Sequence, residues 1–130
     1  MSAPVVTGLG QVAMYVSDLP AAIAFYRDQV GVRFLFEAPP SMAFFQAGGT
    51  RLLIGAAPAG QAVHPPSSLQ FRVADIVAAH RTLVARGVTF KNAPHLVHQA
   101  PGYELWLAEF EAPDGAAHAL LQEKGRLPRA

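Results

Sequence analysis

Hydrophobic and polar side chains alternate in two stretches of the chain that resemble each other. Residues 9–16 carry a hydrophobic side chain at every second position, which predicts a strand with one buried face. The same pattern returns at residues 68–73, and in both copies the strand leads to an aspartate, Asp18 or Asp75. Aspartate is a favourable helix N-cap, so each strand is predicted to run into a helix. Repetition of this kind predicts two copies of one structural unit.

Each copy continues with further strands. The first predicted helix ends at Gly31 and precedes three strands, at residues 32–37, 42–47 and 50–55. The second helix ends at Gly87 and precedes a strand at 88–91, a loop at 92–102, and strands at 103–111 and 116–122. The pattern therefore predicts an α+β fold of two tandem βαβββ modules, which form a curved, cup-like mixed sheet with the helices on its outer face.

We expect a single domain over residues 1–130. Its predicted parts are module 1 at about 9–55, a linker at 56–67 rich in Pro, Gly and Ala, module 2 at about 68–122, and a polar C-terminal tail at 123–130.

Composition narrows the classes of function. The formal net charge is +1 and the basic residues are not clustered, so we expect no nucleic-acid partner. The chain has no cysteine, which excludes disulfides and thiolate metal sites. No hydrophobic run approaches the roughly 20 residues that span a bilayer, and no signal peptide is recognisable. We therefore expect a cytoplasmic protein with no membrane partner.

The two equivalent strands are predicted to point polar side chains into the cup. These side chains are Gln11, Tyr15, Ser68, Gln70 and Arg72. A cation in a cup needs a carboxylate, so Arg72 either meets an acidic ligand or forms an internal salt bridge with Glu104 or Glu109. Both interpretations stay open.

A second group of candidates lies close together in the sequence. Residues 93–106 contain two histidines, a carboxylate, a tyrosine and the only tryptophan: His95, His98, Tyr103, Glu104 and Trp106. They are predicted to lie on the long loop and the strand after it, where they could line a ligand pocket, serve structure only, or form a non-standard metal site. Within the group, His98 and Glu104 are candidate acid–base residues. Phe44, Phe45 and Trp106 could stack on a planar ligand.

Several short motifs together resemble the vicinal oxygen chelate superfamily, which includes glyoxalase I, bleomycin-resistance proteins, extradiol dioxygenases and methylmalonyl-CoA epimerase. The motifs are Val16-Ser-Asp-Leu19 with Phe25-Tyr26 and Gly31, Val73-Ala-Asp-Ile76 with Gly87-Val88, and Pro113-Asp-Gly115 before the last strand. The resemblance extends from about residue 9 to 122. It implies the cup-shaped fold and a homodimer.

Enzymes of this superfamily hold a divalent metal through a His or Gln on the first strand of each module and a Glu on the last. The resemblance places these ligands at Gln11, Leu53, Ser68 and Ala119. An amide, a hydroxyl and two hydrocarbon side chains do not make a catalytic metal site, which needs about three imidazole, thiolate or carboxylate ligands. We therefore predict no metal and no cofactor.

The favoured prediction is a metal-independent protein that binds a small, planar or aromatic molecule in its cup, as bleomycin-resistance proteins do in a groove between two subunits. One alternative is a lyase, isomerase or dioxygenase, either with unusual metal ligands or metal-free with His98 or Glu104. Another is a dimeric interaction module with a vestigial cup.

Overall fold

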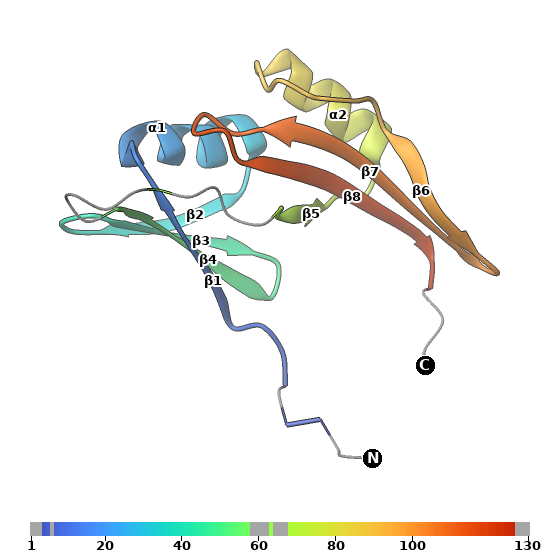
Figure 1. The fold of residues 1–130 in the computed structure, drawn as a ribbon, viewed down its shortest axis with the longest axis horizontal. Helices are drawn as coiled ribbons and strands as arrows, with labels where there is room; N and C mark the ends of the chain where they lie inside the picture. The colour runs from blue at the N-terminus through green and yellow to red at the C-terminus, as the bar shows by residue number, and fades with distance from the viewer. Residues whose placement is uncertain (1–3, 6, 58–62, 64–67, 127–130) are drawn as a thin grey trace.

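The computed structural model describes residues 4–5, 7–57, 63 and 68–126, and shows two four-stranded mixed sheets with helices packed against them (Figure 1). The first module contains β1 (Gln11–Val16), α1 (Leu19–Ala24), the π-helical turn η1 (Phe25–Val30), β2 (Arg33–Ala38), β3 (Met42–Ala47) and β4 (Thr50–Ala56). The second contains β5 (Gln70–Arg72), α2 (Ile76–Ala85), β6 (His95–Ala100), β7 (Tyr103–Glu111) and β8 (Ala117–Gly125). The strand orders are β1-β4-β3-β2 and β5-β8-β7-β6, and the first strand of each module pairs in parallel with the last. The predicted fold of two βαβββ modules with open sheets is confirmed.

The same local signals start and end both helices. Asp18 accepts a hydrogen bond from the backbone N–H of Ala21 (3.1 Å), and Asp75 accepts from Val77 and Ala78 (both 3.1 Å). After the helices, Gly31 (φ 87°) and Gly87 (φ 88°) adopt the left-handed conformation that glycine tolerates best. The repeat in the sequence is thus a repeat in structure.

One face of each sheet packs into a common hydrophobic core. The covered face of the first sheet carries Met14, Val16, Phe45, Leu52 and Ile54, and that of the second carries Ala108, Phe110, His118 and Leu120, all buried. The turn of chain at Phe25 and Tyr26 contacts both faces: the ring of Tyr26 lies 6.3 Å from Phe45 and 5.9 Å from His118. Within the described residues no helix covers the opposite face of either sheet, which is called the bare face below.

A buried polar pair joins the two modules. The His118 side chain is fully buried, and its Nδ1 accepts a hydrogen bond from the Leu69 backbone N–H (3.0 Å). In the neutral ring Nε2 must then carry the proton, so Nε2 donates to the Tyr26 hydroxyl oxygen at 2.8 Å. Burial lowers the pKa of His118, and the negative charge of Asp114 only partly opposes this. Burial, and then the charge of Asp114, raise the pKa of Tyr26.

Two sequence predictions about the second module were wrong. Residues 95–100, predicted as part of a loop, form the edge strand β6, while the predicted strand at 88–91 contributes only an isolated bridge between Phe90 and Phe110. An edge strand with both faces exposed needs no hydrophobic alternation, and residues 95–100 show none, which is why the strand was not recognised. The final strand also continues to Gly125, so the first residues of the predicted polar tail are paired with β7.

The predicted linker at 56–67 and the end of the chain lie mostly outside the described residues. Among the helices of the described part, none is both long and hydrophobic enough to cross a membrane.

Candidate small-molecule site

The four positions that the superfamily uses for metal ligands lie in adjacent strands on the bare faces. In the first sheet, β1 pairs with β4 so that Gln11 lies opposite Arg51 and Ala13 opposite Leu53, which places Gln11 and Leu53 on one face. In the second, Gln70 lies opposite Ala119, and Ser68 comes two residues before Gln70. The two positions of each module therefore lie on one bare face.

The side chains at these positions do not fit a divalent metal. The Gln11 amide oxygen already accepts a hydrogen bond from Arg51 Nε at 2.8 Å, and Leu53 and Ala119 have no donor atom. A dication in a partly dehydrated site needs anionic or imidazole ligands, and a neighbouring guanidinium opposes it. No group of three or more His, Asp or Glu side chains in the described residues is arranged to hold a metal ion.

The bare face of the first sheet is an aromatic surface. Tyr15 is 56% exposed and Phe36 is 52% exposed, and the Phe36 ring stacks on Phe44 with centroids 4.8 Å apart. Tyr15 lies over Gly55, the residue opposite it in β4, where a methyl group would meet the ring at 3.4 Å. Met42, 38% exposed, also pairs with Gly55. A flat, exposed aromatic surface of this kind is suited to stacking against a planar molecule.

The bare face of the second sheet is more polar. The Tyr103 hydroxyl donates to Glu123 at 2.7 Å, and this hydrogen bond, followed by burial and the carboxylate's charge, raises the pKa of Tyr103. Arg72 Nη2 also contacts Glu123, at 3.4 Å. His98 lies beside Tyr103 with ring centroids 6.3 Å apart, and His95 pairs with Leu107 on the same face. Arg72 therefore forms an internal ion pair, with Glu123 in place of Glu104 or Glu109.

The predicted site residues are divided between the faces. Gln11 and Tyr15 lie on the bare face of the first sheet, and Gln70, Arg72, His95, His98 and Tyr103 lie on that of the second, with Ser68 beside it. Three others lie on covered faces. Phe45 is fully buried in the core, and Trp106 Nε1 donates to Glu104 at 2.9 Å on the face opposite His98. The sheet thus separates His98 from Glu104, and these two candidates do not form an acid–base pair.

Sequence reasoning missed three residues of the bare faces. Met42 and Phe36 were both expected in the core, and Glu123 in the polar tail. A β-bulge between Phe34 and Phe36 turns Phe36 onto the bare face, which a strict alternation along β2 does not reveal. Glu123 could have been found from strand length, because β7 spans nine residues and its hairpin partner β8 also spans nine.

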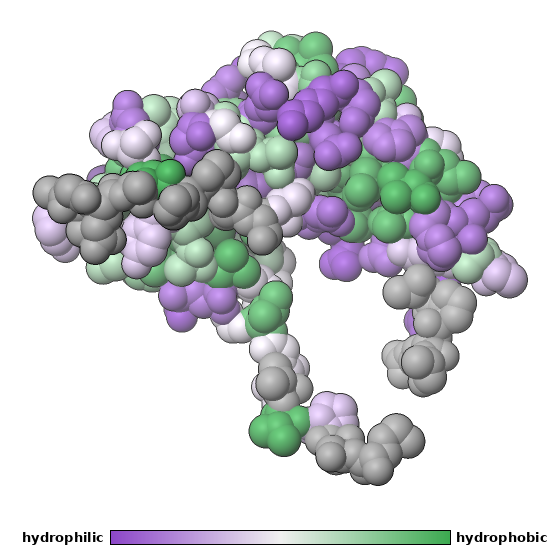
Figure 2. All heavy atoms as spheres, in the orientation of Figure 1, coloured by the Kyte–Doolittle hydropathy of each residue, from purple (hydrophilic) through white to green (hydrophobic). Residues whose placement is uncertain are grey.

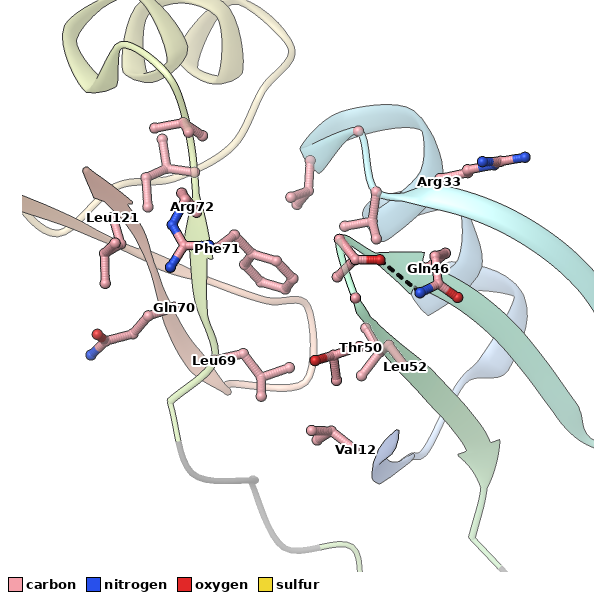
Figure 3. Close-up of a pocket in the computed structure, with 18 of the residues that line it drawn as sticks. Val12, Arg33, Gln46, Thr50, Leu52, Leu69, Gln70, Phe71, Arg72 and Leu121 are labelled. Carbon is pink, nitrogen blue, oxygen red and sulfur yellow. Dashed lines mark hydrogen bonds between the residues drawn. The ribbon is translucent and has the colours of Figure 1, made fainter. Parts of the chain in front are cut away.

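A groove of about 740 Å³ separates the two modules near the free edge of β5 (Figure 3). Leu69 and Phe71 point into this space from β5, and Val12, Thr50 and Leu52 border it from the first module. Arg33 points away from it. In the space-filling view, hydrophobic residues also gather over β6–β8, next to hydrophilic ones (Figure 2). The chain thus offers the bare faces and this groove as places for a small molecule.

Two tandem βαβββ modules with open sheets and one bare face each define a vicinal oxygen chelate fold. The model of the Glyoxalase/Bleomycin resistance protein/Dioxygenase superfamily matches residues 8–120, and the chain belongs to this superfamily. Comparison with curated protein sequences gives no significant match.

Solved structures share the fold at low sequence identity. A lactoylglutathione lyase from Agrobacterium tumefaciens is 22% identical with a TM-score of 0.68, and the match covers 90% of this chain and 94% of that one. A glyoxalase/bleomycin resistance protein/dioxygenase superfamily member from Sphaerobacter thermophilus is 24% identical with a TM-score of 0.68, covering 90% and 98%. An integron cassette protein from the mobile metagenome of V. cholerae is 19% identical with a TM-score of 0.75, covering 93% and 98%. These likenesses establish the fold and leave the ligand to the residues of this chain.

Proposed function

We propose that this protein binds a planar small molecule against its bare sheet faces and does so without a metal. The observation that carries the proposal is the side-chain set at the four positions where the superfamily resemblance implies metal ligands: Gln11, Leu53, Ser68 and Ala119 supply no carboxylate or imidazole. The aromatic surface of Tyr15, Phe36 and Phe44 supports a planar ligand. Gln70 and Arg72, both exposed on the second sheet, supply polar contacts that would orient it.

The proposal includes a homodimer. Tyr15, Phe36 and Met42 together expose hydrophobic surface on one bare face. Contiguous exposed hydrophobic surface of this kind often marks a binding site or an interface with another chain. A second copy that brings its polar bare face opposite this aromatic one would close the site from both sides. A light-scattering mass of one chain at all protein concentrations would contradict this arrangement.

The ligand proposal is tested by thermal shift with a panel of planar aromatic metabolites and antibiotics. We expect at least one compound to raise the melting temperature in a concentration-dependent way, because a ligand that binds only the folded state stabilises it. The Phe36→Ala variant should bind that compound about tenfold more weakly, as expected for the loss of one stacking ring and its buried area.

The matched control is Val84→Ala, which removes a similarly exposed side chain from α2, the helix that packs on the covered face of the second sheet. It should leave the affinity unchanged. A panel without any stabilising compound, or equal losses in the two variants, would count against the proposal.

A further inference from the structure

The groove between the modules differs from the bare faces in its walls, which are built from covered-face side chains, although bare-face residues such as Arg51 and Arg72 also line it. Leu69 and Phe71 form the wall on the β5 side, while Val12 and Leu52 form the wall of the first module (Figure 3). Val30 and Leu120 also line the groove. A space of about 740 Å³ lies far above the voids that packed interiors contain and within the range of ligand sites. The shape and the apolar walls suit the hydrophobic body of a small molecule.

Backbone donors border the groove along the free edge of β5. Leu69 O accepts from the Ala119 N–H (3.0 Å) and the Val73 N–H donates to Leu121 O (2.9 Å), so these residues face β8. Alternate residues of a parallel strand direct their N–H and C=O groups to the opposite edge. The N–H groups of Gln70 and Arg72 therefore point to the edge at which no strand of the described residues lies. Both residues line the groove.

The rim of the groove is positively charged. Its lining includes the arginines Arg51 and Arg72 but no aspartate or glutamate. Arg51 is hydrogen-bonded to a neutral partner, Gln11, and forms no ion pair with the acidic side chains of the described residues. Arg72 makes only a 3.4 Å contact with Glu123, and its side chain is 77% exposed, so most of its donors remain available. Guanidinium and peptide N–H groups together are the usual partners of a carboxylate.

We propose that this groove is a second binding site, for a molecule with a hydrophobic body and a single carboxylate. The hydrophobic body lies beside Phe71 between the two apolar walls. The carboxylate stays at the rim, where the N–H groups of Gln70 and Arg72 and the guanidiniums of Arg51 and Arg72 can donate to it. The site shares Gln70 and Arg72 with the bare face of the second sheet but has its own hydrophobic walls. Variants of Phe71 in the groove and of Phe36 on the bare face therefore distinguish its failure from that of the function proposed above.

Isothermal titration calorimetry of the full chain with decanoate, decanol and acetate tests the proposal. We expect decanoate to bind, decanol to bind at least about tenfold more weakly, and acetate not to bind detectably, because both the hydrophobic body and the charge are needed. The Arg51→Gln/Arg72→Gln double variant should bind decanoate about tenfold more weakly and bind decanol with unchanged affinity. Both arginines are exposed, so this variant should fold normally.

Three further variants distinguish binding in the groove from binding elsewhere on the protein. Arg81→Gln changes an exposed arginine on α2 and should not affect decanoate, which excludes a general charge effect. Phe36→Ala, on the bare face, should also leave the affinity for decanoate unchanged. Phe71→Ala should lower the affinity for both decanoate and decanol. No binding of decanoate, equal affinities for decanoate and decanol, or a loss in Phe36→Ala without one in Phe71→Ala would overturn the proposal.

Discussion

The Phe45→Ala variant is expected to lose about 4 kcal/mol of unfolding free energy, as large-to-small changes of buried phenylalanine do. Phe45 has no exposed surface, and its ring packs against Phe34 at 5.4 Å and Tyr26 at 6.3 Å between centroids. Removing the ring leaves a cavity where the first sheet meets the helical turn. Urea denaturation followed by circular dichroism measures the loss.

The neighbouring residue provides the control. Phe44 is on the opposite, bare face and is only partly buried, so Phe44→Ala should lower the unfolding free energy by about 1 kcal/mol. Both variants remove the same group from consecutive positions of β3. Similar losses in the two would mean that the bare face is packed, which would contradict the assignment of the two faces.

The second large effect is expected at His118. Replacing it with alanine removes the acceptor of the Leu69 N–H and the donor to Tyr26, and it also leaves a cavity at a fully buried position. An unpaired buried donor and a cavity together should lower the unfolding free energy by about 3 kcal/mol. Tyr26→Phe, which removes only the hydroxyl, should cost about 1 kcal/mol. If His118→Ala lowers the unfolding free energy no more than Tyr26→Phe does, the hydrogen bonds of His118 do not stabilise the contact between the modules.

His118 should also make stability depend on pH. Its pKa is lower in the folded protein than in the unfolded chain, so the unfolded state binds the proton more readily. The contribution of neutral His118 to the unfolding free energy is therefore fully present above about pH 6.5. It is lost as the pH falls toward the lowered pKa of His118 in the folded protein. Denaturation midpoints measured across this range should fall with decreasing pH in the wild type and in His98→Gln, but less in His118→Ala. Parallel profiles in all three proteins would exclude His118 as the source.

Much of the fold follows from local signals in the sequence. The two alternating strands, the caps at Asp18 and Asp75 and the glycines at Gly31 and Gly87 act within a few residues, and the structure contains them all. β6 was missed because an exposed edge strand is determined by its partner β7 rather than by its own hydrophobic pattern.

The candidate site was harder to predict, because it depends on which way each side chain faces. Phe44 and Phe45 were both predicted to stack on a ligand, although consecutive residues of a strand face opposite sides. In β7 both faces carry hydrophobic residues, so the pattern alone could not show that Trp106 and Glu104 lie on the covered face. The bulge that exposes Phe36 depends on the pairing of β2 with β3 and has no clear local signal.

The central claim, a vicinal oxygen chelate fold that binds its ligand without a metal, is tested most directly by elemental analysis. The protein is purified without chelators or a metal-binding tag, dialysed against zinc, nickel, iron and manganese salts, and desalted. The bound metal per chain is then measured by inductively coupled plasma mass spectrometry. We predict far less than one metal ion per chain, because Gln11, Leu53, Ser68 and Ala119 supply no anionic or imidazole ligand. One tightly held ion per chain, lost in Gln11→Ala or His98→Ala, would contradict the account.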